Sequence, residues 1–374
     1  MKFNVAGKAL QQQLQAVSKV INSKNALAIL DNFLLRVEGD TLYITGSDSE
    51  NVVTASLEIM NSEGDGMIAA SAKILLDIIK EISAQPVTFC VNDNTFEIDV
   101  RFLTGHFNFM GVDPREYPTR AEHTPEALSF KVPASVVQKG IDKTLYAVSS
   151  EQIRPIMTGI FWDIHPGDIT FVSSDTHKLV RYINSESAPG IESSFIMPAK
   201  PAGILRGLLN KEDGEIEVTM DPKSATFKWG VYELSCRLIK GTYPNYNRVI
   251  PMSSPYKLTV DRVSLINALR RVSLFASKAS SLVRMVINGS EIKLSSQDLD
   301  YATKADETVT ADYQGNPLTI GFNAVYTIEV LNNLPGDMTL IELSDPARPG
   351  VFQPLVQEEG ENIVTIEMPM QVLE

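Results

Sequence analysis

Asp175 and His177 are the two side chains whose types and spacing most suggest catalysis. They lie two positions apart, directly after a strand-like apolar run. A carboxylate and an imidazole so placed could act as a general acid–base pair, as in a nucleic-acid hydrolase. Such an enzyme needs clustered carboxylates for metal ions, and the sequence has no convincing cluster. It also lacks a Ser or Cys nucleophile motif and a Gly-rich phosphate loop. We therefore predict no catalytic residues, no metal and no cofactor.

Basic side chains in helical stretches are the second group with chemical potential. The formal net charge of −13 argues against nucleic-acid binding when it is counted over the whole surface. The helical stretches nevertheless contain few acids, such as Asp77, Glu81, Asp142 and Glu329. Their basic residues are Lys8, Lys19, Lys73, Lys80, Lys139, Lys143, Lys200, Arg206, Arg270 and Arg271. Since Lys and Arg also suit any exposed helix position, the excess alone leaves both interpretations open.

The composition is that of an ordinary globular protein. The chain has 374 residues, 44% hydrophobic and 21% charged, which is enough for two or three domains with separate cores. No apolar run has signal-peptide or membrane-spanning length, so we expect a soluble, unsecreted protein with no membrane contact. Cys90 and Cys236 are the only cysteines and form no CxxC pair, which favours buried thiols in a reducing cytoplasm.

An internal repeat determines the architecture. The segments that begin at Met1, Leu128 and Tyr256 resemble one another at offsets of about 127 and 128 residues. Each predicts an alternating strand followed by a helix with one apolar face. The apolar positions are Leu10, Leu14 and Ile21; Val137, Ile141 and Val148; Leu265, Leu269 and Ala276.

Two further markers recur in the same order. An aspartate follows a strand at Asp48, Asp175 and Asp298, and a second helix begins near Ala72, Ala199 and Ala324. The apolar pairs of that helix are Ile78 with Ile82, Leu205 with Leu209, and Val330 with Leu334. Three ordered markers indicate triplication, with domains 1–125, 126–252 and 253–374 separated at Pro-containing segments. The predicted class is α+β, with two helices per repeat packed on antiparallel sheets.

Four motifs together resemble one protein family, the beta sliding clamp of bacterial DNA polymerase III. They are the opening Met1-Lys-Phe3, the segment Thr242-Tyr-Pro-Asn-Tyr-Asn-Arg-Val-Ile-Pro251, the turn Ser174-Asp-Thr-His-Lys-Leu179 and the terminal Met368-Pro-Met370. The resemblance runs from end to end. It implies a non-catalytic, head-to-tail homodimeric ring that encircles duplex DNA without reading its sequence.

The resemblance also implies partners and DNA contacts. A ring of this family is loaded by a clamp loader and tethers the replicative polymerase, other DNA polymerases and repair proteins through short peptide motifs. Lys24, Lys73, Lys80 and Lys200 match basic positions that contact DNA in the family. The acidic remainder of the chain is then expected on the outer surface.

A groove for partner peptides is implied by the same resemblance, in place of an acid–base role for His177. Met and Pro suit such a surface because flexible thioethers repack around different ligands. The implied groove residues are Arg154, Ile156, Met157, Thr176, His177, Lys178, Leu179, Pro244, Arg248, Val249, Asn323, Tyr326, Arg348, Pro349, Met368, Pro369 and Met370. Without the resemblance, Met368 and Met370 would be assigned to a final edge strand packed on the core.

Three positions depart from the family pattern. Thr176 replaces a common Gly, Lys178 replaces a common Arg, and Val372-Leu-Glu374 extends past the usual end. These changes affect the shape of the groove and hence the peptide that it prefers.

Four apolar residues are implied at the dimer contact: Phe107 and Phe109 on an alternating strand, and Leu274 and Phe275 at the end of a helix. Ordinary core packing is the alternative for these side chains. A second alternative concerns the whole chain, which could be a repeat scaffold that binds proteins without encircling DNA. Basic helix faces separate the two, because a scaffold has no need to gather Lys and Arg.

Overall fold

The computed structural model describes residues 1–118, 120, 122–210 and 214–372. The chain forms two compact units, Met1–Ser135 with Lys200–Leu238, and Val136–Ala199 with Ile239–Glu374. Every named strand pair in the described residues is antiparallel. No described helix is long and apolar enough to cross a membrane.

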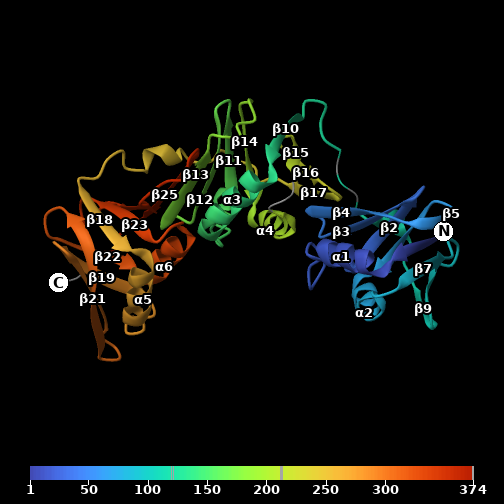
Figure 1. Cartoon of the computed structure of the whole chain (residues 1–374), viewed down its shortest axis with the longest axis horizontal. Helices are drawn as coiled ribbons and strands as arrows, with labels where there is room; N and C mark the ends of the chain where they lie inside the picture. The colour runs from blue at the N-terminus through green and yellow to red at the C-terminus, as the bar shows by residue number, and fades with distance from the viewer. Residues whose placement is uncertain (119, 121, 211–213, 373–374) are drawn as a thin grey trace. The chain divides into compact units, whose positions relative to one another are not determined.

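The first unit contains two sheets (Figure 1). The five-stranded sheet has the order β5 (Met60–Glu63), β1 (Lys2–Ala6), β7 (Pro86–Val91), β8 (Glu97–Phe102) and β9 (Gly105–Met110). The eight-stranded sheet has the order β10 (Leu128–Pro133), β15 (Glu215–Met220), β16 (Ser224–Trp229), β17 (Tyr232–Arg237), β4 (Asn51–Glu58), β3 (Thr41–Ser47), β2 (Asn32–Glu38) and β6 (Gly66–Ser71). Strands of the first and second repeats therefore share one sheet.

The second unit contains one sheet of twelve strands. Their order is β14 (Ser193–Pro198), β11 (Gly159–His165), β12 (Asp168–Ser174), β13 (Lys178–Asn184), β25 (Glu361–Glu367), β24 (Gly350–Pro354), β23 (Met338–Leu343), β18 (Tyr256–Asp261), β21 (Thr303–Gln314), β20 (Glu291–Asp298), β19 (Leu282–Asn288) and β22 (Leu318–Asn323). Here strands of the second repeat continue into those of the third.

Six α-helices occur among the described residues, two per repeat. They are α1 (Gly7–Ser18), α2 (Ala72–Ile82), α3 (Ala134–Thr144), α4 (Ala199–Leu208), α5 (Arg262–Ser273) and α6 (Ala324–Asn333). Within the units, α1 packs beside α2 and α5 beside α6 (Figure 1). The fold is the predicted one, three α+β repeats with helices on antiparallel sheets.

Local sequence explains where several helices begin. Ser71 accepts a hydrogen bond from the Ile74 amide, Asp261 from the Ser264 amide at 2.7 Å, and Asn323 from the Val325 amide at 2.9 Å. Such side chains satisfy amides that have no partner within the first helical turn.

In the first helix of each repeat, two of the three predicted apolar positions are confirmed as buried. They are Leu10 and Leu14, Val137 and Ile141, and Leu265 and Leu269. The third positions were placed wrongly, because Ile21, Val148 and Ala276 follow the helix ends. In α2 the fully buried residues are Leu75 and Ile79, and of the predicted pair Ile82 is buried whereas Ile78 is only half-buried. Both cysteines are free thiols, but Cys90 is half-buried rather than buried.

Candidate functional site

The repeated aspartates are structural. Asp48, Asp175 and Asp298 each accept hydrogen bonds through Oδ1 from the amides two and three residues later, at 2.7 to 3.2 Å. This is an Asx turn. Because Asp175 has the same role in its repeat as its two counterparts, the interpretation of Asp175 with His177 as an acid–base pair loses its support. Within the described residues, no three His, Cys, Asp or Glu side chains gather as a metal ion would require.

The turn at Asp175 is strained. Thr176 has φ of +80°, as does Ser49 in the equivalent turn of the first repeat. Left-handed backbone is unusual for a residue other than Gly and costly for a β-branched one. This accounts for the expected preference for Gly at Thr176.

A hollow of about 230 Å³ lies beside this turn. Its apolar floor and sides come from β13, β25 and the segment after β17. The lining residues are Arg154, Met157, Ser174, Thr176, His177, Lys178, Leu179, Tyr243, Pro244, Asn245, Tyr246, Val249, Ile366 and Met368. We call this hollow the groove.

The register of β13 and β25 orients the groove's apolar side chains. Leu179 lies opposite Ile366, and the Met368 amide donates to the carbonyl of His177 at 2.8 Å. Side chains alternate along a strand, so Ile366 and Met368 face the groove and Glu367 faces the opposite side. Val249 and Met368 remain about half exposed. Exposed apolar side chains around a hollow are typical of a binding surface.

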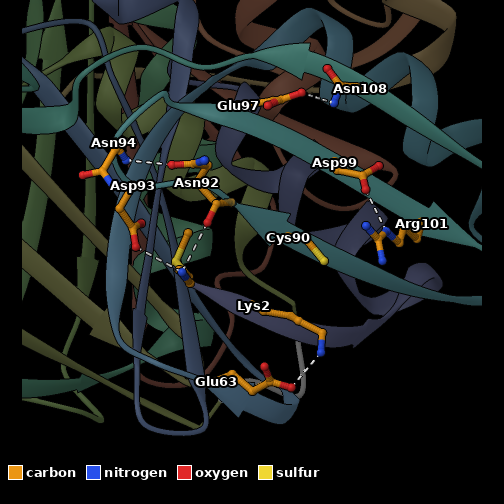
Figure 2. A pocket seen from close by; sticks show the side chains of 12 residues that line it. Lys2, Glu63, Cys90, Asn92, Asp93, Asn94, Glu97, Asp99, Arg101 and Asn108 are labelled. Atoms are coloured by element: carbon orange, nitrogen blue, oxygen red, sulfur yellow. Dashed lines mark hydrogen bonds and ion pairs between the residues drawn. The ribbon is translucent and has the colours of Figure 1, made fainter.

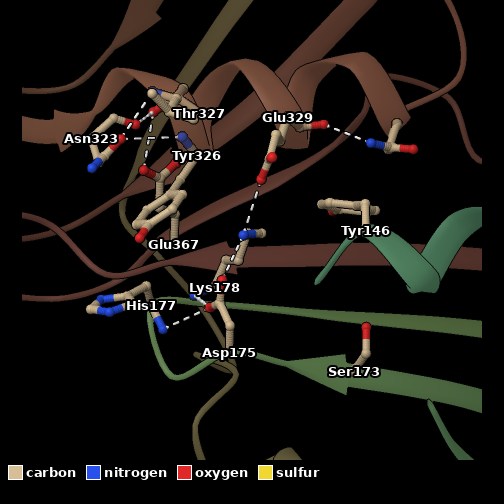
Figure 3. Close-up of polar contacts among 12 residues, drawn as sticks. Tyr146, Ser173, Asp175, His177, Lys178, Asn323, Tyr326, Thr327, Glu329 and Glu367 are labelled. Carbon is tan, nitrogen blue, oxygen red and sulfur yellow. Dashed lines mark hydrogen bonds and ion pairs between the residues drawn. The ribbon is translucent and has the colours of Figure 1, made fainter. Parts of the chain in front are cut away.

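The rim of the groove continues into a polar network (Figure 3). The Lys178 ammonium is 2.6 Å from Asp175 Oδ2 and 3.1 Å from Glu329 Oε2, and it lies over the ring of Tyr326. Burial alone would lower the pKa of Lys178, but its hydrogen bonds and charge interactions with Asp175 and Glu329 outweigh burial and raise it. His177 stacks on Tyr326 with ring centroids 5.4 Å apart.

Glu367 lies beneath this network, fully buried. Its Oε1 accepts a hydrogen bond from Thr327 Oγ1 at 3.1 Å (Figure 3). Burial raises the pKa of Glu367 well above its ordinary value. The carboxyl group behind the groove is therefore protonated, and hence neutral, well above the pH at which an exposed glutamate ionises.

The structure brings together only part of the implied groove. Ile156 packs against the apolar cluster behind it, and Tyr326 stands at the rim. Asn323 caps α6, and the Met370 amide bonds to Gly321. Eight of the implied residues lie outside the lining: Ile156, Arg248, Asn323, Tyr326, Arg348, Pro349, Pro369 and Met370. In the C-terminal extension, Val372 lies near Gly321, whereas Leu373 and Glu374 lie outside the described residues.

Sequence reasoning missed five lining residues: Ser174, Tyr243, Asn245, Tyr246 and Ile366. A signal was present for the tyrosines, because both belong to the motif around Pro244. Tyr243 stacks on Phe161 at 4.7 Å and Tyr246 donates to Asp163 Oδ2 at 2.7 Å. These contacts fix the segment after β17 against the sheet.

The basic side chains expected near DNA include some without and some with a partner among the described residues. Lys8, Lys24, Lys73, Lys80 and Arg270 are exposed and make no side-chain hydrogen bond or ion pair with any other described residue. Lys200 instead donates to the Val20 carbonyl at 2.9 Å, to Asn22 Oδ1 at 2.6 Å and to Asp48 Oδ2. Three acceptors use all three N–H groups of an ammonium. Lys200 therefore has no free donor for the phosphate contact expected of it.

Models of the DNA polymerase III beta subunit match the chain in three consecutive parts. The N-terminal domain model matches residues 1–121, the central domain model 131–245 and the C-terminal domain model 247–371. The beta sliding clamp of Pseudomonas aeruginosa is 25% identical over 373 residues, covering 100% of both chains. That of Staphylococcus aureus is 26% identical over 376 residues, covering 98% of this chain and 97% of the relative.

Solved structures of sliding clamps have the same fold. The Pseudomonas aeruginosa clamp superposes with a TM-score of 0.94 at 24% identity, covering 100% of each chain. The clamp of Bartonella birtlesii bound to griselimycin gives a TM-score of 0.92 at 26% identity, again covering 100% of each chain.

Proposed function

The chain belongs to the DNA polymerase III beta subunit family, and on this premise we propose that two copies close head to tail into a ring around duplex DNA. It is a non-catalytic sliding clamp whose partners are DNA and the polymerase. We further propose domain boundaries of 1–125, 126–252 and 253–374, which the three model matches support. The cytoplasm is the proposed location, as for a DNA replication protein.

One observation carries the ring proposal: a rule of strand pairing between repeats. The strand after each aspartate turn pairs with the last strand of the next repeat. In the first instance β4 pairs with β17, with Asn51 opposite Cys236. In the second, β13 pairs with β25, with Lys178 opposite Glu367. Among the described residues no fourth repeat follows the third, so a second molecule could pair the corresponding strand of the third repeat in this way.

Two free strand edges fit this rule. Within the described residues, β21 has no strand partner along 303–310 on the side opposite β20, because β18 pairs only with 311–314. The last strand of the first repeat, β9, is the edge of its sheet. Unpaired edges of this kind readily pair with another chain.

Equivalent positions give the register. Thr303 closes the third turn as Asn51 and Lys178 close the first two. Met110 ends β9 and pairs with Glu97, the first residue of β8. In the second repeat, Arg237 ends β17 and pairs with Ser224, the first residue of β16. Met110 therefore corresponds to Arg237, and Phe109 to Cys236. We therefore expect Thr303 opposite Phe109 of the second copy. The pairs that follow are Lys304 with Asn108, Ala305 with Phe107, and Asp306 with His106.

The apolar residues agree with this register. Tyr146, just after α3, lies 3.2 Å from Thr365 on β25 through their hydroxyl groups. In the proposed pairing of β21 with β9 of a second copy, Leu274 takes the place of Tyr146, and Phe107 takes the place of Thr365. Leu274 of one copy therefore meets Phe107 of the other. Leu274 is 80% exposed and Phe275 42% exposed in the single chain, which argues against core packing for both. Assembly would remove this exposed apolar surface from water.

Cysteine cross-linking tests the register. Asn108→Cys with Lys304→Cys places two thiols directly opposite on one face, within disulfide reach. Mild oxidation should therefore yield covalent dimers. Asn108→Cys with Ala305→Cys is the matched control, because Ala305 points to the other face. Wild-type protein, oxidised in the same way, shows whether the native Cys90 and Cys236 form cross-links by themselves. Cross-linking of the control pair alone, or monomer mass for wild type, would disprove the proposed joint.

Lys24, Lys73 and Lys80 are the proposed DNA contacts, supported by their free ammonium groups. A clamp held topologically should remain on circular DNA and slip from linear ends. A repeat scaffold that binds proteins alone would be retained on neither, so this comparison separates the two functions.

The groove is the proposed docking site for short peptide segments of the polymerase. It is also proposed for the clamp loader and for other DNA polymerases and repair proteins. Leu179, Val249, Ile366 and Met368 supply the apolar surface against which a few anchors would carry most of the affinity. Val249→Asp should abolish binding of a polymerase peptide, and Val231→Asp, at a similarly exposed valine outside the groove, should not.

A further inference from the structure

His106 lies at the free edge of β9, on the face of the sheet opposite Phe107. Its Nδ1 is 2.9 Å from Asp99 Oδ1, and its side chain is 65% exposed. The other oxygen of Asp99 accepts a hydrogen bond from Arg101 Nε at 2.7 Å (Figure 2). His106 Nε2 has no hydrogen-bond partner within the described residues and is available to a second molecule.

The register proposed above places Asp306 of the second copy directly opposite His106. Opposed side chains in an antiparallel pair share a face, with Cβ atoms about 4.5–5.5 Å apart. Asp306 is exposed and has no ion pair with any other described residue. The Asp306 carboxylate of the second copy, which has no ion-pair partner among the described residues, therefore lies near His106 Nε2.

We infer that His106 bridges two carboxylates at each joint of the ring, Asp99 of its own chain and Asp306 of the second copy, and that its protonation tightens the ring. The inference rests on the proposed head-to-tail assembly. It concerns a contact and a pH response in addition to the apolar residues of the joint.

The chemistry of imidazole sets the direction. Both ring nitrogens donate only in the protonated form, and a neutral ring donates through one nitrogen alone. Protonated His106 can donate to both carboxylates. The neutral ring can donate to one of them only, and the other then loses its hydrogen bond from His106. Asp306 reaches the charged ring in the dimer only, so this contact adds stability to the ring where the imidazole is protonated, which is expected at the lower pH.

Other charged groups lie near the joint on both copies. On β8, Arg101 is bonded to Asp99, and Glu97 to Asn108 at 2.6 Å. On the second copy, Lys304 on β21 would face Asn108, and Lys293 on β20 lies beside Thr308. Carboxylates, Lys and Arg remain charged between about pH 5.5 and 8. The half-buried Cys90 on β7 also shares this face, opposite Asp99.

The test measures the dimer dissociation constant of the full chain at pH 5.5 and pH 8 by analytical ultracentrifugation. With one exposed contact at each of two joints, we expect wild type to associate about tenfold more tightly at pH 5.5. H106Q and D306N should each remain dimeric and lose this difference. H165Q is the matched control and should keep it. His165 is also an exposed histidine beside two carboxylates, Asp163 and Glu192, but it lies in β11, a strand that is paired on both sides and is neither of the two free edges.

The outcomes separate the two proposals. Wild type that is monomeric at both pH values would overturn the assembly and the inference together. A dimeric wild type whose pH response survives in H106Q would overturn the inference and leave the assembly intact. Loss of the response in H165Q as well as in H106Q would assign it to general charge effects, which also overturns the inference.

Discussion

Lys200→Met should destabilise the chain while leaving its affinity for DNA nearly unchanged. The substitution removes three donated hydrogen bonds, to Val20, Asn22 and Asp48. It also leaves the Asp48 side chain, 5% exposed, without its cation. Breaking a buried pair costs about 3–5 kcal/mol. Because Lys200 itself is 39% exposed, solvent screening reduces the expected loss to about 1–2 kcal/mol.

Lys73→Gln with Lys80→Gln should have the opposite effects. Neither ammonium has a partner among the described residues, so the free energy of unfolding should change by less than about 0.5 kcal/mol. Each phosphate contact contributes roughly 0.9 to the slope of log affinity against log salt concentration. The double variant should therefore lower the magnitude of that slope by about 1.8, whereas Lys200→Met should leave it unchanged.

Two measurements decide between these roles: urea unfolding, and fluorescence anisotropy of a short duplex over a range of salt concentrations. A slope reduced by about 0.9 in Lys200→Met, with an unchanged unfolding midpoint, would refute the structural role. The pH dependence gives an independent check. Burial raises the pKa of Asp48, but Lys200 and Asn51 outweigh burial and lower it. A carboxylate with a lowered pKa stabilises the fold at pH values above its pKa in the unfolded chain, and this stability is lost as the pH falls. The difference in free energy of unfolding between wild type and Lys200→Met should therefore shrink in acid.

Asp221→Asn should cost about 2 kcal/mol at pH 7 in urea unfolding, because backbone amides and Ser224 outweigh burial and lower the pKa of Asp221 to about 2. That cost should vanish as pH falls from about 4 towards 2, and a constant cost would refute it. Leu274→Asp with Phe275→Asp should give folded monomers by light scattering, whereas Ile153→Asp, at a side chain 85% exposed, should stay dimeric. Deleting Met368–Glu374 should abolish polymerase binding and preserve the dimer, and a monomeric product would show the tail to be structural.

The sequence by itself determined the repeat, the leading strand and helix of each domain, and the turn aspartates. These features depend on local causes, namely apolar periodicity, caps such as Asp261, and carboxylates that bind amides two and three residues later. The helix boundaries were less certain, because Ile21 and Val148 continue an apolar pattern after the helical hydrogen bonding has ended.

The groove required more than local pattern. The terminal Met368 was predicted as a wall, yet Ile366, two residues earlier on the same face, was missed. Whether a strand residue lines a hollow depends on its register with a distant strand, here β13, and no local sequence signal encodes that register. Tyr243 and Tyr246 were missed for a related reason, since their stacking and hydrogen bonds are with residues of β11.

Tertiary structure alone decided which basic side chains are free. Lys73 and Lys200 occupy the same position near the start of the second helix in their repeats, and sequence reasoning treated them alike. One is unpartnered among the described residues, and the other is bound by Val20, Asn22 and Asp48. The difference arises because a charge is neutralised by groups adjacent in space, and for Lys200 these groups lie about 150 to 180 residues away in the sequence.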